Sequence, residues 1–272
     1  MKIYDTHIHS KNSLDAKSTV DEICQSAILK GVCGITITDH IESYGVGSDA
    51  YEFGNSDVLI PQSFKEIAAA QAKYVNKLQI FKGIEFGQPC LSKQTANHVA
   101  SYGETDFVLA SVHADINGNE YYYIDFSKTD YSQVLEGYFA QVLTTAQNAE
   151  FDSLAHLTYP LRYIFRDTGV RVDALKSNGV AIARILHTLA IRGKALEVNT
   201  SELFRDYGTF LPDEEIVRLF YRLGGKYVTL GSDSHVFGTI GQGFEAAAAC
   251  LQKAGFGSYV YYANHNPVSV AL

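Results

Sequence analysis

The sequence predicts an α/β protein in which seven or eight strand–helix units close into one barrel. Short apolar runs alternate with longer segments of helical periodicity, a pattern typical of a mostly parallel sheet covered by helices. The length of 272 residues suits a single barrel. An open nucleotide-binding sheet is disfavoured because His7-Ile8-His9 follows the first predicted strand, where such sheets carry a glycine-rich phosphate loop.

The predicted strands are short and rich in Ile, Val, Phe or Leu, as strands buried on both faces are. They cover residues 2–4, 34–38, 78–84, 107–112, 153–155, 195–198 and 226–230. One further run at 258–263 predicts either an eighth strand or an edge strand. Seven runs in succession favour one barrel domain over residues 1–272.

Helices are predicted between these runs. Residues 18–30 carry Val20, Ile23 and Ala27 on one face, with Ser18 as a start signal and Gly31 as the residue after the end. Comparable spacing of apolar residues predicts helices over 61–78, 93–102, 131–149, 172–192, 212–223 and 243–254.

The charge of the chain bears on its partners. The formal net charge is -8, from 30 acidic and 22 basic residues, so no basic surface for nucleic acid or an anionic membrane is expected. We therefore expect a small-molecule substrate. An anionic substrate remains compatible with this charge, because bound cations would reverse the local sign.

The cysteines and the N-terminal segment indicate a cytoplasmic protein. The four cysteines form no C-x-x-C pair, and sparse free cysteines suit a reducing compartment. The N-terminal sequence MKIYDTHIHS lacks the apolar stretch of a signal peptide. No run is long and apolar enough to span a bilayer.

Histidines and acids gather where predicted strands end. These residues are His7, His9, His40, Glu85, His113, His156, Asp233 and His235. Strand C-termini meet at one rim of a parallel barrel, and active sites form there. Imidazoles and carboxylates are ligands for zinc, iron and manganese. By contrast, His98, His187 and His265 end no core strand and are interpreted as packing or surface residues.

These residues exceed the ligands that one ion needs. A catalytic zinc takes about three protein ligands, so the set predicts two to three divalent transition metals, zinc, manganese or iron. Glu85 is the natural bridging ligand because a carboxylate has two oxygens. Clustered metals suit phosphoryl chemistry, since they stabilise both the attacking and the leaving oxygen.

The motifs resemble those of the PHP (polymerase and histidinol phosphatase) family. They are DTHIHS at 5–10, TDH at 38–40, SVH at 111–113 and GSDSH at 231–235. The length, the ALEVNTS segment and the ending VTLGSDSH…GQGFEAA are most similar to the histidinol-phosphate phosphatase branch. The resemblance runs over nearly the whole chain and implies a distorted (β/α)7 TIM-like barrel with a metal site at the C-terminal rim of the strands.

The resemblance also implies three ligand sets. The first metal would take His7, His9, Glu85 and Asp233; the second Glu85, His113 and His156; the third Asp15, His40 and His235. The family often has histidine where this chain has Asp15, so the third site departs from the family pattern in chemical type.

Two arginines are candidates for phosphate binding, because a guanidinium matches phosphate oxygens. Arg162 lies after the fifth predicted strand and Arg205 after the sixth, and the resemblance implies a phosphate-binding arginine in each loop. The segment around Arg205 is longer than the family pattern, so Arg166 or Arg184 could take its place. The long aromatic and acidic loops 41–60 and 114–128 are candidate lids.

The expected function is phosphate monoester hydrolysis. The resemblance implies conversion of L-histidinol phosphate to L-histidinol and phosphate in histidine biosynthesis, with Asp233 or His235 handling protons. The alternative is a PHP phosphoesterase for nucleotides or other small phosphate esters. A non-catalytic scaffold would have lost ligands, yet every strand-end position here is filled. A metal hydrolase of C–N bonds would have a lysine bridge or a different ligand pattern, and the sequence shows neither of these two features.

Overall fold

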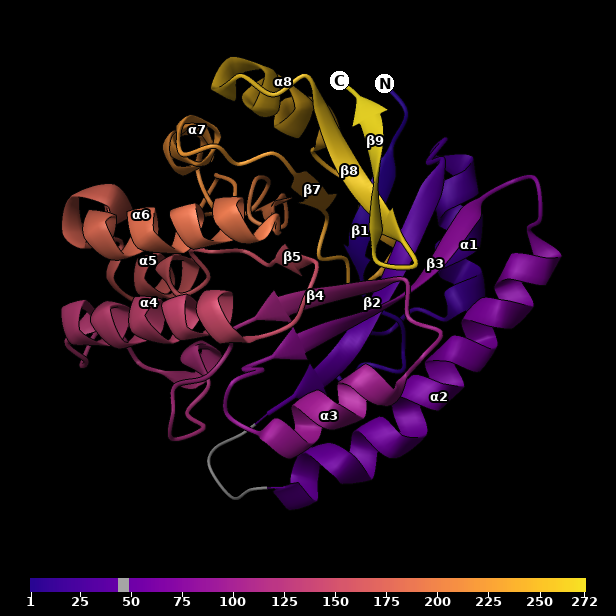
Figure 1. The fold of residues 1–272 in the computed structure, drawn as a ribbon, viewed down its shortest axis with the longest axis horizontal. Coiled ribbons are helices and arrows are strands. Elements are labelled where there is room, and N and C mark those ends of the chain that lie inside the picture. The colour runs from indigo at the N-terminus through magenta and orange to yellow at the C-terminus, as the bar shows by residue number, and fades with distance from the viewer. Residues whose placement is uncertain (44–48) are drawn as a thin grey trace.

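The computed structural model describes residues 1–43 and 49–272, and its centre is a seven-stranded parallel sheet (Figure 1). The strands pair in chain order: β1 Tyr4–Ile8, β2 Gly34–Glu42, β3 Gln79–Gly87, β4 Phe107–Ser111, β5 Ser153–Leu154, β6 Ala195–Asn199 and β7 Val228–Gly231. The residues after β7 reach back to β1, where the amide of His9 donates to the carbonyl of Ser234 at 2.9 Å. The predicted distorted (β/α)7 barrel is confirmed.

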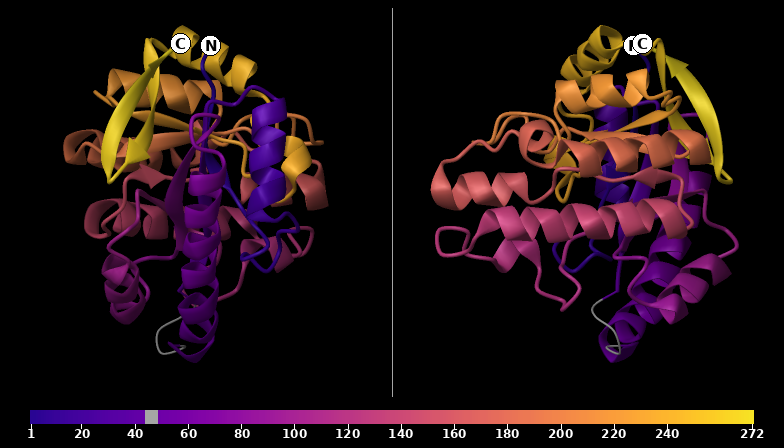
Figure 2. Two further views of the ribbon diagram at one scale, coloured as in Figure 1. Left: turned by 90° about the vertical axis from the view of Figure 1, so that its right-hand side faces the viewer. Right: turned by 60° about the vertical axis from the view of Figure 1, so that its left-hand side comes forward.

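Helices surround this barrel, as the further views in Figure 2 show. They are α1 Val20–Leu29, α2 Asp49–Lys73, α3 Lys93–Ser101, α4 Tyr131–Asn148, α5 Leu161–Thr168, α6 Ala174–Arg192, α7 Glu214–Arg222 and α8 Phe244–Ala254. The short 3-10 helices η1 and η2 cover Tyr121–Tyr123 and Phe237–Thr239. No helix within the described ranges is both long and apolar enough to cross a membrane.

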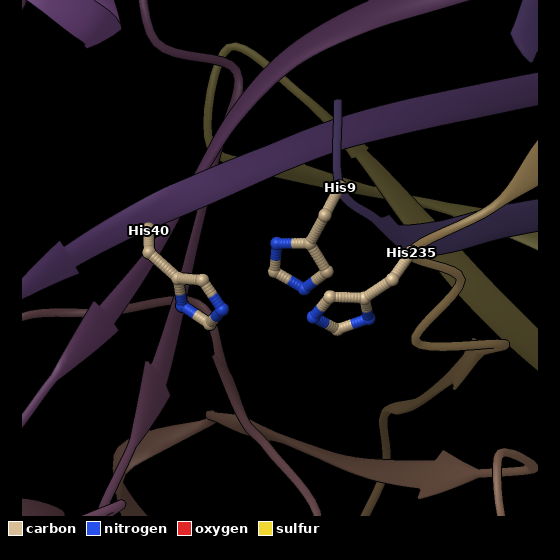
Figure 3. A group of neighbouring side chains, drawn as sticks. All are labelled: His9, His40 and His235. Atoms are coloured by element: carbon tan, nitrogen blue, oxygen red, sulfur yellow. The ribbon is translucent and has the colours of Figure 1, made fainter. Parts of the chain in front are cut away.

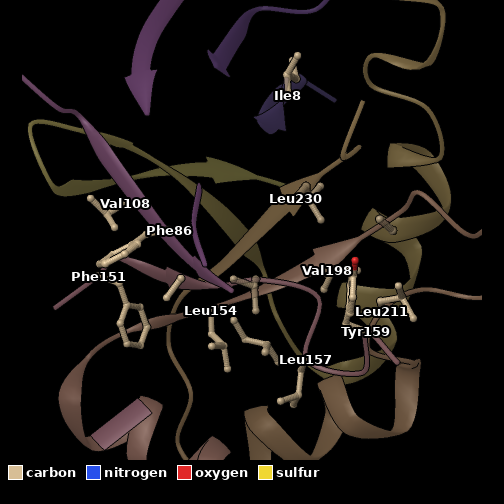
Figure 4. Packing of buried hydrophobic residues seen from close by; sticks show 14 of the residues in the cluster. Ile8, Phe86, Val108, Phe151, Leu154, Leu157, Tyr159, Val198, Leu211 and Leu230 are labelled. Carbon is tan, nitrogen blue, oxygen red and sulfur yellow. The ribbon is translucent and has the colours of Figure 1, made fainter. Parts of the chain in front are cut away.

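The layer between the sheet and these helices is the main hydrophobic core (Figure 4). Leu154, Val198 and Leu230 come from three neighbouring strands and are at most 1% exposed. This packing holds the strand ends in fixed relative positions, which the site at the rim requires.

The first strand lies later than predicted. The apolar run suggested residues 2–4, whereas β1 covers Tyr4–Ile8 and includes the buried polar residues Asp5, Thr6 and His7. A search for apolar runs does not find these residues, because they are polar and are buried with hydrogen-bond partners inside the barrel. For example, the hydroxyl of Thr6 donates to the carbonyl of Leu230 at 3.0 Å.

The loop predicted over 41–60 is largely wrong. Residues 41 and 42 end β2, and residues from Asp49 onward belong to α2, while 44–48 lie outside the described part of the chain. The helix predicted over 61–78 is part of α2, which begins earlier, at Asp49, so Pro61 lies inside the helix. Helix α5 was also missed, since eight residues are too few to display a period.

The last run is neither an eighth barrel strand nor an edge of the main sheet. Strand β8 (Ser258–Ala263) forms an antiparallel hairpin with β9 (Asn266–Ala271). Tyr261 stacks on Tyr4 with 4.1 Å between ring centroids, and Tyr262 stacks on Phe107 at 5.3 Å. Tyr4 and Phe107 begin β1 and β4, so the hairpin covers the N-terminal end of the barrel, away from the rim.

Candidate metal centre

The strand-end residues predicted as ligands meet at the C-terminal rim. His7, His40 and Glu85 lie within β1, β2 and β3. His9 follows β1 directly, His113 and His156 come two residues after β4 and β5, and Asp233 and His235 follow β7. The parallel order of the strands brings all of them to one place although they span most of the chain.

Glu85 is the centre of this group. Its side chain is 1% exposed, and five imidazoles surround the carboxylate. The nitrogen–oxygen distances are 3.0 Å to His7, 3.2 Å to His9, 3.3 Å to His40, 3.1 Å to His113 and 3.0 Å to His156. One carboxylate thus contacts donors from four other strands, which is the geometry expected of a bridging ligand.

Asp233 approaches the same group from β7. Its Oδ1 lies 3.6 Å from Nε2 of His7 and 3.5 Å from Nε2 of His9. The backbone of Asp233 has φ 52°, in the left-handed region that non-glycine residues seldom adopt. Its amide donates to the carbonyl of His7 at 2.9 Å, which holds this conformation and directs the carboxylate inward.

A second part of the group lies nearer the surface. In Figure 3 the rings of His9, His40 and His235 surround one space. Their centroids are 4.3 Å apart for His9–His40 and for His9–His235. Asp15 Oδ2 lies 2.9 Å from Nε2 of His235 and 3.7 Å from Nε2 of His40, and the Asp15 side chain is 58% exposed. Asp15 therefore lies beside His235 and His40, and its role as a metal ligand stays a prediction.

The donor chemistry fits divalent cations. Nitrogens of His7 and His9 face each other at 3.0 Å, an arrangement that a shared cation would satisfy better than two imidazoles alone. Among the described residues, potential ligand atoms lie within 4.8 Å of one another in five trios: His9–His40–His235, His7–His9–Glu85, His7–His156–Asp233, His40–Glu42–His113 and Glu85–His113–His156. Mixed imidazole and carboxylate donors of this kind suit zinc, iron or manganese.

Glu42 belongs to the group and was missed in the sequence. Its Oε1 lies 2.7 Å from Nδ1 of His113 and 3.2 Å from Nδ1 of His40. Gly87 leaves the room for it, because a Cβ there would lie 1.9 Å from Oε2 of Glu42. The signal was its spacing: two residues after His40 on one strand, Glu42 shares its face.

Glu197 was also missed. It is fully buried in β6, and its Oε1 lies 2.7 Å from Nδ1 of His7. Its Oε2 accepts from the amide of His156 at 2.8 Å and from Nδ2 of Asn199 at 3.2 Å. A glutamate within the apolar strand sequence ALEVN could have indicated it, since buried acids are rare without partners.

Asp39 holds the loop that follows β1. This buried carboxylate accepts from the amide of Ser10 at 2.7 Å and from the hydroxyls of Ser10, Ser13 and Ser63 at 2.7, 2.8 and 2.6 Å. The Oγ of Ser13 in turn lies 3.3 Å from Nδ1 of His9. Asp39 thereby restrains both His9 and the loop that carries Asp15.

The acids of the group are held ionised. Burial alone would raise the pKa of Glu85, but the charges of His7, His113 and His40 hold that pKa well below its ordinary range. Burial would likewise raise the pKa of Glu42, but the neighbouring His113 and His40 outweigh burial and lower that pKa to about 2. Negative charge is therefore available at this rim at neutral pH.

A cavity of about 630 Å³ opens over the group, within the range of small-molecule sites. Arg162 lines it from α5, with Nη1 3.9 Å from Oδ2 of Asp233 and 3.5 Å from Oε1 of Glu202. Arg205 also lines it and lies 3.0 Å from the same Glu202 oxygen, with a side chain that is 64% exposed. Both sequence-predicted arginines thus face one cavity.

The other candidates fall in different places. Neither Arg166 nor Arg184 lines this cavity. Loop 114–128 contributes Glu120, Tyr122 and Tyr123 to the lining, and its role as a lid stays a prediction. His265 pairs with Asp152 at the hairpin, at 2.8 Å, so it lies at the other end of the barrel.

The fold and the site together define the class: a TIM-like barrel enzyme with a cluster of metal-capable side chains at the rim. The PHP domain family model matches residues 5–201, and the chain belongs to this family. The family resemblance seen in the motifs is therefore confirmed.

Relatives and solved structures support this membership. The chain is 32% identical to a histidinol-phosphatase of Lactococcus lactis over 94% of this chain and 93% of that protein. It is 31% identical to a probable histidinol-phosphatase of Thermotoga maritima, over 93% and 92%. The crystal structure of the Lactococcus lactis histidinol phosphate phosphatase with zinc, L-histidinol and phosphate superposes with a TM-score of 0.83 and 28% identity, covering 98% and 99% of the two chains.

Proposed function

We propose that this protein is a metal-dependent phosphatase that hydrolyses L-histidinol phosphate to L-histidinol and phosphate. The similarity to the Lactococcus lactis enzyme extends over 94% of this chain, and that enzyme's structure contains zinc, L-histidinol and phosphate. The reaction belongs to histidine biosynthesis, and we place it in the cytoplasm. The net charge of -8 supports a small-molecule substrate without a nucleic acid partner.

The observation that carries the proposal is the position of Arg162. Its guanidinium lies at the cavity wall, 3.9 Å from the carboxylate of Asp233, and the Arg162 side chain is 11% exposed. Among the described residues its Nε has no hydrogen-bond partner, although it is buried. A guanidinium with a spare donor beside a metal-capable cluster suits a phosphate dianion, which needs both cations and N–H donors.

We assign the ligands as three neighbouring sets, of which the first two share Glu85. His7, His9, Glu85 and Asp233 would hold one divalent cation, Glu85, His113 and His156 a second, and Asp15, His40 and His235 a third. Zinc, manganese or iron fits these donors. When bound, such cations supply Lewis-acid chemistry: they acidify a water molecule and neutralise phosphoryl oxygens.

The chain's own residues do the rest. Arg162 and Arg205 bind the phosphoryl oxygens and turn the phosphorus toward the rim. Asp233 or His235 handles protons at the reacting oxygens, since both lie at the cavity surface. The buried wall formed by Tyr159 and Tyr163 limits the water that reaches the phosphoryl group.

The test is a phosphate-release screen of the metal-analysed protein. The substrates are L-histidinol phosphate, nucleoside monophosphates and p-nitrophenyl phosphate. The expected result is a kcat/KM for L-histidinol phosphate at least about 100-fold above the others, a preference that corresponds to about 2.7 kcal/mol. Equal or better turnover of nucleotides would overturn the substrate and favour the alternative of a phosphoesterase for other small esters.

A further inference from the structure

A line of aromatic rings runs from the mouth of the cavity to the metal-capable cluster. The ring centroids of Tyr122 and Tyr163 are 5.6 Å apart, those of Tyr163 and Tyr159 are 5.2 Å apart, and those of Tyr159 and His156 are 4.8 Å apart. All four residues line the cavity, and so does Tyr123, whose ring packs on Tyr122 at 5.0 Å. One wall of the cavity is therefore a continuous aromatic surface, which we call the tyrosine wall.

Two arginines, one helical turn apart on α5, pack on this wall. The Cζ of Arg162 lies 4.3 Å from the ring centroid of Tyr159 and 5.0 Å from that of Tyr163. The Cζ of Arg166 lies 5.1 Å from the centroid of Tyr163 and 5.6 Å from that of Tyr122. Arg162 lines the cavity and Arg166 does not, so Arg166 contacts the tyrosine wall from outside the cavity.

Arg166 also binds the backbone of the loop that carries the outer tyrosines. Its Nη1 donates to the carbonyl of Tyr122 at 3.0 Å, and its Nη2 donates to the carbonyl of Ile124 at 3.3 Å. The neighbouring Asp167 accepts from the amide of Phe126 at 3.0 Å and pairs with Arg166 at 2.6 Å. Three backbone groups of the loop are thus satisfied by one arginine–aspartate pair.

The Arg166–Asp167 pair holds the part of the loop that is not packed against the hydrophobic core. Tyr121 and Phe126 are buried and anchor the loop on either side. Between them Tyr122 is 52% exposed and Tyr123 is 76% exposed, so packing alone does not fix their rings. The hydrogen bonds from α5 set the path of the backbone and thereby the direction of both side chains.

We propose that Tyr122 and Tyr123 recognise the imidazole-bearing part of the substrate, and that Arg166 and Asp167 are positioning residues for them. This inference rests on the proposed function. With the phosphate near Arg162, the leaving group extends along the tyrosine wall toward the cavity mouth. Tyrosine faces attract both a flat heteroaromatic ring and its protonated, cationic form.

The experiment compares two phosphate monoesters in the full-length, metal-loaded protein. L-Histidinol phosphate has an imidazole, whereas ethanolamine phosphate has an amine and no ring. The variants are Arg166→Met, Arg166→Lys and Tyr123→Ala, with Arg184→Met on α6 as the matched control, because Arg184 is exposed and does not line the cavity. Metal content is measured for each protein.

In Arg166→Met we expect KM for L-histidinol phosphate to rise about 10-fold, with kcat and metal content nearly unchanged. The kcat/KM for ethanolamine phosphate should change less than about 2-fold, because that substrate has no imidazole for the two tyrosines to recognise. The readout is the ratio of kcat/KM for L-histidinol phosphate to kcat/KM for ethanolamine phosphate. Tyr123→Ala should lower this ratio, as Arg166→Met does. Arg166→Lys should restore part of the ratio through one carbonyl contact, and Arg184→Met should equal wild type.

Equal losses for both substrates in Arg166→Met would overturn the inference, since the arginine would then only support the fold. Wild-type ratios in both Arg166→Met and Tyr123→Ala would overturn it as well. Tyr123→Ala keeps the test decisive if Arg166→Met folds poorly, because the Tyr123 side chain is mostly in solvent. Failure of the proposed function is read separately: the wild-type protein itself would show no preference for L-histidinol phosphate.

Discussion

The carboxylate of Glu197 and the imidazole of His7 face each other inside the barrel, 2.7 Å apart and both fully buried. Nδ1 of His7 donates to Oε1 of Glu197, so Nε2 is left to face Glu85 at 3.0 Å. Such a carboxylate partner selects the tautomer and the ring orientation of a metal-binding histidine. Glu197 therefore belongs to the site although it does not line the cavity.

The first prediction tests this pair. Glu197→Gln keeps the side-chain shape but removes the charge that orients His7, so zinc affinity should fall about 10–100-fold. A titration of the protein with zinc against a competing chelator measures this change. Glu245→Gln is the matched control, because Glu245 is an exposed acid on α8. Wild-type affinity in the Glu197 variant would refute the orienting role.

The second prediction concerns Glu85. Its carboxylate lies 3.0 Å from both His7 and His156, on two sides of the cluster. Glu85→Gln removes a bridging charge, so at least one metal ion per chain and more than about 99% of the phosphate release should be lost. Elemental analysis of the purified variant provides the count. Full metal content together with a normal rate would mean that Glu85 is no ligand.

The third prediction is the response to metal removal. Protein made in metal-replete medium should contain two to three transition metals per chain, as the three proposed ligand sets predict. Chelation followed by desalting should abolish phosphate release and lower Tm, because ions that bind only the folded state stabilise it, by about 4 kcal/mol at a thousandfold excess over Kd. Calorimetry and a zinc or manganese add-back check both. One ion or fewer per chain would contradict the cluster.

The fourth prediction separates phosphate binding from metal binding. Arg162→Met should leave the metal content unchanged and lower kcat/KM for L-histidinol phosphate about 10²–10³-fold, since a charge-assisted contact to the reacting group is lost. Arg162→Lys should recover only part, because a point charge cannot make two parallel N–H···O bonds. Steady-state kinetics with parallel metal analysis decide it. Normal kinetics in Arg162→Met would exclude this arginine from the phosphate site.

The fifth prediction concerns a glycine beside the site. A Cβ at Gly231 would lie 2.1 Å from Oε1 of Glu197 and 2.5 Å from Cβ of His7. Gly231→Ala should therefore destabilise the fold by about 1–3 kcal/mol and weaken zinc binding, as overpacking forces both side chains to move. Gly137→Ala in α4 meets nothing within 4 Å and should instead stabilise by about 0.5–1 kcal/mol. Chemical denaturation of the two variants gives the comparison, and equal stabilities would refute the steric argument.

Short-range patterns in the chain were enough to predict the barrel and the location of the site at its C-terminal rim. The alternation of apolar runs and helical periods predicted the seven strands, and the strand-end positions of His113, His156 and Asp233 placed them at one rim. Local sequence patterns did not predict the extent or the pairing of a segment where contacts with distant segments determine them. Strand β1 extends through Asp5 and His7 because the barrel supplies their partners, and the run at 258–263 could not reveal that it pairs with β9.

By itself, the sequence determined the fold class, the family and the residues that gather at the rim, because in a parallel barrel the C-terminal ends of all strands lie at the same rim. Only the tertiary structure decided which of these side chains touch and which others join them. Glu197 meets His7 across 190 positions of the chain, and Glu42 meets His113 across 71. Contacts of that kind leave no local periodicity, since they depend on how distant segments pack and on the space that Gly87 and Gly231 leave open.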